Sequence, residues 1–301
     1  MVILAFTTSG RPAMRLATLN NYGLLQVTGD EARPFLHGQF TNDIENLAPG
    51  QARFAGWCTA KGRLLATFLV IARKDGFLLQ LSRDITPAIA KRLTMFVLRS
   101  KVKVADVSAD WVQAGAWDAA SLSVLGVTPS PAAFGVVEAG GTLAVTVGPG
   151  RWLVLAQGDA ARRLVADAPE SEWTRAEIHA GRALISQPVQ DQFVPQMVNL
   201  ELAGGVDFRK GCYPGQEIVA RAQYRGAVKR RMYRLRGATD LVAGQGLLGG
   251  DEPGEGGGMV VMAAGDEALA VLPVAAVEAK AEIRATSGAG ALEVLSLPYS
   301  A

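Results

Sequence analysis

The sequence predicts an α+β protein whose C-terminal part is a small β-barrel or sandwich. The first observation is an order of three strands, a helix and a strand between residues 54 and 107. The second is a similar unit of strands and helices between residues 143 and 184. The third is a set of short strands with glycine-rich turns after residue 230.

The first unit follows an initial strand at residues 22–27 and a short helix that ends at Gln39. Asp30 is the predicted N-cap of that helix, and Pro34 is tolerated because it lies in the first turn. The turns Lys61-Gly62 and Asp75-Gly76 separate the next three strands. Their predicted ranges, with the helix and strand that follow, are 54–58, 63–72, 77–81, 84–97 and 102–107.

The second unit consists of two strands and two helices, predicted at residues 143–147, 151–156, 159–167 and 171–184, after a loop at 129–131. Nine glycines between residues 237 and 258 then predict a flexible surface hairpin. Short strands are predicted around it, at residues 232–236, 258–263, 268–273, 281–286 and 291–297.

Composition excludes several classes of protein. A formal net charge of +2 gives no global field for DNA or membranes, so we expect neither as a partner. Two cysteines are too few for a disulfide framework and suit a reducing compartment. The apolar run at residues 1–6 is too short for a signal peptide. We therefore expect a cytoplasmic protein.

Generic catalytic motifs are absent. No G-x-x-x-x-G-K-[ST] loop occurs, and the glycines at 254–258 lack the preceding strand and following helix of a dinucleotide site. The two histidines and two cysteines are spaced too widely for a metal signature.

Residues 210–217, KGCYPGQE, are unusual. Cys212 lies close to the cations of Arg209 and Lys210, and the Pro214-Gly215 turn leads into a helix near Gln216. Nearby cations and a helix N-terminus favour the thiolate form of a cysteine. The alternative is a small buried hydrophobic residue in a turn.

This octapeptide resembles the hallmark of the YgfZ family, which is related to the glycine-cleavage T-protein, an aminomethyltransferase. Further segments resemble the family pattern in order and extend the resemblance over nearly the whole chain: residues 38–43, 61–63, 193–196, 199–200, 204–205, 219–221, 225–226 and 297–300.

The resemblance implies a three-domain cloverleaf, in which two ferredoxin-like α+β domains and a C-terminal β-barrel surround a central channel that holds folate. The expected domains are residues 1–50 with 110–225 for folate binding, 51–109 for a second α+β domain, and 226–301 for the barrel. We expect a monomer.

The implied cofactor is tetrahydrofolate or a derivative, whose pocket needs aromatic faces, polar groups and cations. Tyr22 and Trp173 fall where the family has folate-contacting tryptophans, and His179 falls where it has a glutamate facing the pterin. A neutral imidazole cannot accept two N–H donors as a carboxylate does. The alternative is that the two aromatics are core residues and His179 an ordinary helix residue. The remaining expected folate-binding residues are Gln196, Lys210, Gln216, Glu217 and Arg221.

Nine basic residues gather between residues 209 and 236. They predict either a docking surface for polyglutamate tails, RNA or a protein, or a solvated strand edge. The nine are Arg209, Lys210, Arg221, Arg225, Lys229, Arg230, Arg231, Arg234 and Arg236.

T-proteins use an aspartate on the strand after the hairpin, but residues 59–74 contain neither Asp nor Glu. Aminomethyl transfer by that mechanism is therefore disfavoured, and whether the chain is an enzyme stays open. The resemblance implies an accessory protein that supports assembly or repair of iron–sulfur enzymes and thereby tRNA modification, with Cys212 as its functional thiol and iron–sulfur proteins as clients. The alternatives are a folate-dependent one-carbon transferase with another base, and a folate-sensing module that recruits a partner.

Overall fold

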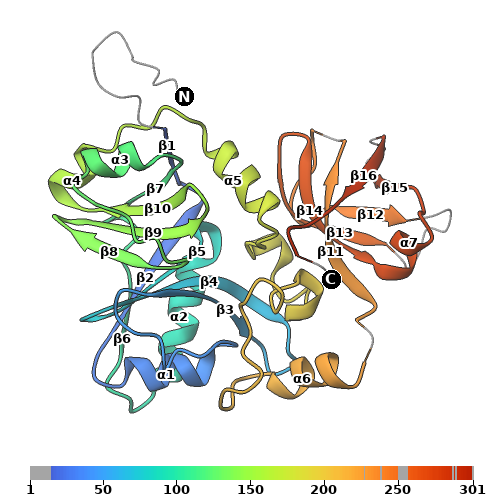
Figure 1. Ribbon diagram of the computed structural model, residues 1–301. Helices are drawn as coiled ribbons and strands as arrows, with labels where there is room; N and C mark the ends of the chain where they lie inside the picture. The colour runs from blue at the N-terminus through green and yellow to red at the C-terminus, as the bar shows by residue number, and fades with distance from the viewer. Residues whose placement is uncertain are drawn as a thin grey trace, which may run out of the picture.

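The computed structural model describes residues 15–299 except 227, 238, 250–256, 287 and 289. The apolar run at residues 1–6, Ser300 of the family-like C-terminal segment and part of the glycine cluster lie outside the described residues. Two five-stranded antiparallel sheets and a closed barrel make up the fold (Figure 1). The α+β class and the C-terminal barrel predicted from the sequence are therefore confirmed.

The first sheet has the strand order β3-β4-β5-β2-β6. Nine of the ten residues of β4 are buried, because both faces of the sheet are covered. The strands are β2 (Tyr22–Thr28), β3 (Ala52–Cys58), β4 (Leu64–Arg73), β5 (Gly76–Ser82) and β6 (Lys103–Asp106).

Helices α1 (Ala32–Gln39) and α2 (Thr86–Val97) cover one face of this sheet, with side chains such as Leu36 and Ile89 in the core beneath them. A 3₁₀ turn, η1 (Arg83–Ile85), precedes α2. The predicted cap of α1 is wrong: Glu31 holds the N-cap position and makes no side-chain capping bond. Helix α1 is therefore stabilised by packing against the sheet and not by a side-chain cap.

The second sheet has the order β1-β7-β10-β9-β8, and α3 (Ala119–Val124) and α4 (Gly158–Arg162) lie on its outer face. Its strands are β1 (Leu16–Thr18), β7 (Val112–Ala116), β8 (Val136–Ala139), β9 (Thr142–Gly148) and β10 (Arg151–Ala156). The chain changes sheets between β1 and β2. Strand β2 thus pairs with β5 and β6, whereas the expected boundaries placed it with residues 110–225.

The inner faces of the two sheets pack against each other through side chains such as Leu24, Leu78, Val145 and Leu153. Helix α5 (Glu170–His179) packs between these sheets and the barrel. It is shorter than the helix predicted to reach residue 184, because Gly181 adopts a φ of 65° just after its end. The Tyr299 hydroxyl donates a hydrogen bond of 2.6 Å to the Gly181 carbonyl.

The barrel closes in the order β11-β14-β13-β12-β15-β16. Strand β12 lies inside the glycine-rich stretch predicted as a loop, and helix α7 (Val274–Glu278) was not predicted. The strands are β11 (Arg230–Arg236), β12 (Gly246–Gly249), β13 (Gly258–Ala264), β14 (Glu267–Pro273), β15 (Ile283–Ala285) and β16 (Ala291–Leu295).

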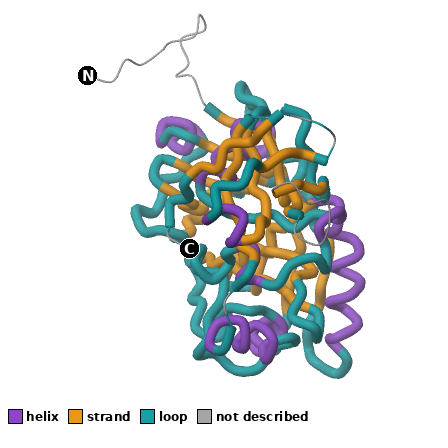
Figure 2. Tube along the Cα trace, turned by 90° about the vertical axis from the view of Figure 1, so that its right-hand side faces the viewer, coloured by secondary structure: helices purple, strands orange, loops and turns teal. Residues whose placement is uncertain are grey.

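A long connection joins α5 to the barrel through two 3₁₀ turns, η2 (Gln187–Val189) and η3 (Pro195–Val198), and helix α6 (Gln216–Tyr224). Asn199 fixes it to the barrel: its buried amide donates a hydrogen bond of 2.8 Å to the Met232 carbonyl. Seen from the side, the strands fill the middle of the molecule, with helices and loops around them (Figure 2).

Candidate functional site

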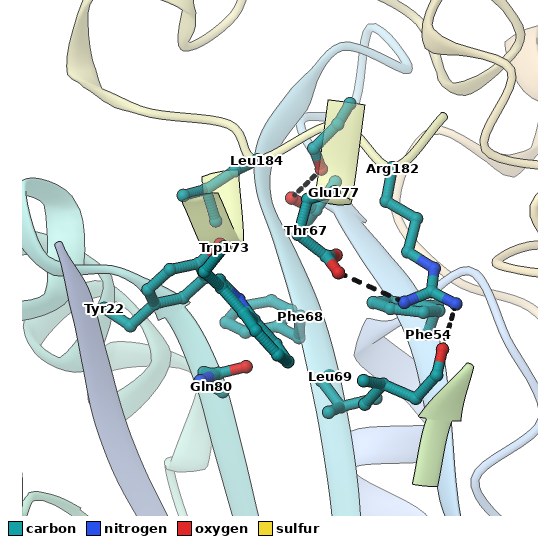
Figure 3. Close-up of a pocket in the computed structure, with 12 residues that line it drawn as sticks. Tyr22, Phe54, Thr67, Phe68, Leu69, Gln80, Trp173, Glu177, Arg182 and Leu184 are labelled. Atoms are coloured by element: carbon teal, nitrogen blue, oxygen red, sulfur yellow. Dashed lines mark hydrogen bonds and ion pairs between the residues drawn. The ribbon is translucent and has the colours of Figure 1, made fainter. Parts of the chain in front are cut away.

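A pocket lies between the two sheets, at the side covered by α5 (Figure 3). The cavity is narrow, with a volume of about 40 Å³ open to a water-sized group, inside about 460 Å³ of space between atoms that includes open solvent. Both sheets, α5 and the segment after it contribute side chains. The lining residues are Tyr22, Phe54, Thr67, Phe68, Leu69, Gln80, Val147, Trp173, Glu177, Arg182, Ala183 and Leu184.

Trp173 and Tyr22 are the two predicted site residues that the fold brings together here. Trp173 is 3% exposed and meets Trp117 edge-on, with 5.8 Å between ring centres. Gly115 makes room for it, because a Cβ at that position would lie 2.0 Å from the indole. Burial, and then the negative charge of Glu177, raises the pKa of Tyr22 far above its ordinary value, so its phenol stays neutral.

Glu177 is a pocket residue that sequence reasoning missed. Its carboxylate is 2.9 Å from the Arg151 guanidinium and 3.3 Å from that of Arg182, and all three side chains are largely buried. Arg182 also donates to the Val147 carbonyl and lies over the Phe54 ring, 5.1 Å from its centre. The missed signal was spacing: Glu177 is four residues after Trp173, so both share one face of α5.

Strand β4 offers the pocket no carboxylate, as the sequence indicates. Its polar contribution is Thr67, whose hydroxyl donates to the Ala183 carbonyl at 2.9 Å and accepts from the Ile185 amide at 3.1 Å. Gln80 on β5 donates through its amide nitrogen to Gln113, at 2.9 Å. Its amide oxygen faces the space beside Trp173 (Figure 3). The pocket therefore presents two acceptors, Gln80 and Glu177.

His179 does not line the pocket. Its Nε2 lies 2.7 Å from Glu267 of the barrel, and its side chain is 47% exposed. Residues two positions apart point to nearly opposite sides of a helix, so a residue at 179 cannot share the face of Glu177. His179 therefore does not point toward the pocket in which a pterin would bind.

The KGCYPGQE segment lies away from the pocket, and none of its residues lines it. It packs against the hairpin after β3, where a Cβ on Gly215 would meet the Thr59 carbonyl at 2.4 Å. Gly215 has a φ of 79° and directly precedes α6, which explains why glycine is needed there. Cys212 is exposed on this loop.

Lys210 is the cation that the fold sets into this loop. Its ammonium donates to the carbonyls of His37 and Gly211, at 2.7 and 3.1 Å, and lies 4.7 Å from the centre of the Tyr213 ring. Burial lowers its pKa to about 8, against the opposing effect of Asp43 and Asp207. The other cysteine, Cys58, is a buried thiol whose pKa burial raises to about 12, so it is the less reactive of the two.

The remaining expected folate-binding residues do not line the pocket either. Gln196 is fully buried and donates to the Val219 carbonyl at 2.7 Å, which fastens η3 to α6. Glu217 and Arg221 are exposed on α6, and Gln216 is half-buried at its start. These residues build the connection rather than the pocket.

Two further features bear on the class of site. Among the described residues, no group of three or more His, Cys, Asp or Glu side chains could hold a metal ion. No helix in the described part of the chain is long and apolar enough to cross a membrane.

No protein-family model matches the chain. The glycine cleavage system aminomethyltransferase T from Bartonella henselae superposes with a TM-score of 0.69 over 96% of this chain and 87% of that chain, at 17% identity, which shows a common fold.

Curated relatives are closer in sequence. The chain is 32% identical to the tRNA-modifying protein YgfZ of Klebsiella pneumoniae, covering 98% of this chain and 95% of the relative. It is 34% identical to the protein of that name from Vibrio vulnificus, over 76% of this chain and 72% of the relative. The chain therefore belongs to the YgfZ family.

Proposed function

We propose that this chain is a folate-binding accessory protein with a role in tRNA modification, and that the pocket beside α5 holds the pterin of tetrahydrofolate or a derivative. The observation that carries the proposal is the pairing of Trp173 and Glu177 on one face of α5, both lining the pocket. An aromatic face beside a carboxylate suits a flat heterocycle with N–H donors. The role in tRNA modification is supported by the names of the curated relatives.

The hydrogen-bond acceptors of the pocket suit the donor edge of the cofactor. A 2-amino-4-oxo pterin carries adjacent N–H donors on one edge, and the carboxylate of Glu177 and amide oxygen of Gln80 are acceptors for such an edge. The guanidiniums of Arg151 and Arg182 stabilise the negative charge of Glu177 in this partly buried site. When bound, the folate supplies a carrier for a one-carbon unit.

Calorimetric titration of the purified chain with tetrahydrofolate tests this assignment. We expect saturable binding by the wild type, and Glu177→Gln to weaken it by about tenfold or more, because a charge-assisted hydrogen bond contributes about 1.5–3 kcal/mol. Glu172→Gln is the matched control, since Glu172 is on the same helix but in an exposed pair with Arg15. A folded wild type that gives no binding would contradict the folate assignment.

The thiol of Cys212 has a role separate from that of the pocket. Cys212 is exposed on a loop outside the pocket, where a partner can reach it while the pocket is occupied. We infer that it acts on client proteins during assembly or repair of iron–sulfur enzymes, and that tRNA modification depends on those enzymes.

Complementation of a deletion strain checks the role of the thiol. We expect Cys212→Ser to lose rescue of iron–sulfur enzyme activity, because a serine hydroxyl cannot replace a thiol as a nucleophile or sulfur ligand. Folate binding should be unchanged in this variant. The buried Cys58, replaced by alanine, serves as the control. Full rescue by Cys212→Ser would show that the thiol is dispensable.

One observation favours a second candidate, folate-dependent one-carbon transfer. A carboxylate does line the pocket, although it comes from α5 rather than β4. Turnover of an aminomethyl donor by the wild type, lost in Glu177→Gln, would support this candidate over the accessory role. The two guanidiniums that engage the carboxylate favour binding instead.

A further inference from the structure

Seven of the nine basic residues near the thiol loop separate into two groups. Three arginines of β11 are used inside the molecule: Arg231 pairs with Glu201, while Arg234 and Arg236 lie 3.7 and 3.4 Å from Glu267. A second group is exposed and, within the described residues, makes no side-chain ion pair or hydrogen bond. This group consists of Arg209, Arg221, Arg225 and Lys229.

Helix α6 sets two of these free cations beside an aromatic ring. Arg221, Tyr224 and Arg225 are spaced by three and four residues, which places them on one face at the end of the helix. Tyr224 is 70% exposed, an unusual position for so large a side chain. Phe208 supports it from the neighbouring loop, with ring centres 5.8 Å apart at a steep angle, so one face of the tyrosine is left open.

A polar hollow adjoins this ring, with an empty volume of about 900 Å³ that includes open solvent. Its charged groups are Arg53, Asp207 and Arg209, and Arg53 is already paired with Asp43 at 3.7 Å. Asp207 accepts a hydrogen bond from the Arg209 amide at 2.8 Å, so it is engaged by the loop itself. The complete lining is Asn42, Arg53, Gly204, Val206, Asp207, Phe208, Arg209 and Tyr224.

Free guanidiniums beside an open aromatic face suit one class of ligand. Arginine binds phosphate through its planar array of donors, and an exposed tyrosine ring stacks on an unpaired base. An acidic peptide or a polyglutamate tail would use the cations but would leave the ring without a partner.

We propose that Arg209, Arg221, Tyr224 and Arg225 form a surface that binds a single-stranded segment of RNA. One base stacks on Tyr224 next to the hollow, and the arginines contact the flanking phosphates. The choice of RNA over an acidic peptide rests on the exposed ring of Tyr224, on which an unpaired base can stack. The surface is distinct from the folate pocket, so each assignment can fail without the other.

Fluorescence anisotropy with a labelled single-stranded oligoribonucleotide of about 12 nucleotides, within the span of a single-strand binding site, tests the proposal. We expect Tyr224→Ala to weaken binding by about tenfold, because stacking on one base is lost. Tyr224→Phe keeps the ring and should bind as the wild type does. Arg221→Ala with Arg225→Ala should weaken binding further and lower the slope of log affinity against log salt by about 1.4, since two phosphate contacts are removed.

Arg162→Ala with Arg163→Ala is the matched control, because it removes the same charge from the last residue and the C-cap of α4, far from α6 (Figure 1). Tetrahydrofolate titration of the same variants should be unchanged, which separates this surface from the pocket. Two results would overturn the proposal. The first is no RNA binding by the wild type. The second is RNA binding that Tyr224→Ala leaves intact and that a polyglutamate peptide displaces as well as unlabelled RNA does. The second result would indicate an acidic protein partner.

Discussion

Replacing Trp173 with alanine is expected to abolish tetrahydrofolate binding and to lower the stability of the α+β part of the chain by about 3–5 kcal/mol. The indole is 3% exposed and lies within the core between the two sheets, so its removal leaves a large cavity. It is also the largest aromatic surface in the pocket. Calorimetric titration at a temperature below the melting transition measures the loss of binding.

Two variants separate stacking from folding. Trp173→Phe keeps an aromatic face and should retain weakened binding. Trp117→Ala removes the ring that meets Trp173 edge-on but does not itself line the pocket, so binding should survive. Wild-type affinity in a folded Trp173→Ala protein would show that the ligand binds elsewhere.

Replacing Glu267 with alanine is expected to destabilise the contact between the barrel and α5 by roughly 2–3 kcal/mol. The carboxylate is largely buried and lies 2.7 Å from His179, 3.7 Å from Arg234 and 3.4 Å from Arg236. Without it, the guanidiniums of Arg234 and Arg236 lose their counter-charge, and the His179 imidazole loses its hydrogen-bond partner. Breaking a buried pair costs about 3–5 kcal/mol, and the partial exposure of the partners reduces that figure. Differential scanning calorimetry measures the effect as a lower melting temperature.

Glu282→Ala is the control for this substitution. Its carboxylate pairs with Arg284 at 2.7 Å, but both side chains are more than half exposed, so the expected loss is below about 1 kcal/mol. Equal melting temperatures for Glu267→Ala and the wild type would show that Glu267 does not hold α5 to the barrel.

Much of the fold was predictable because its strands are strongly patterned. Strand β4 is an apolar run, and β13 and β14 are apolar segments separated by a glycine turn. Strand β12 was missed because its GLLG sequence has little intrinsic strand preference. It becomes a strand by pairing with Gly258 and Met259 on one side and β15 on the other.

The candidate site was predictable only in part. The positions of Tyr22 and Trp173 followed from the family resemblance, and the structure brings them into one pocket. The orientation of His179 could not be foreseen, because its partner Glu267 is 88 residues away in the sequence. Glu177 lies in no recognisable motif, and only its spacing of four residues from Trp173 places it on the pocket-facing side of α5. Likewise, only the fold separates the paired arginines of β11 from the free ones around α6.

The fit of Trp173 against Gly115 constrains how this protein can change through evolution. Any side chain at position 115 collides with the indole, and any smaller residue at position 173 leaves a void above the glycine. A single substitution at either position therefore gives a less stable protein, and an exchange of both residues has to pass through one such variant. The two positions should vary as a pair among descendants of this chain. A lineage that exchanges its pocket tryptophan for a smaller residue should carry alanine or a larger residue in place of Gly115.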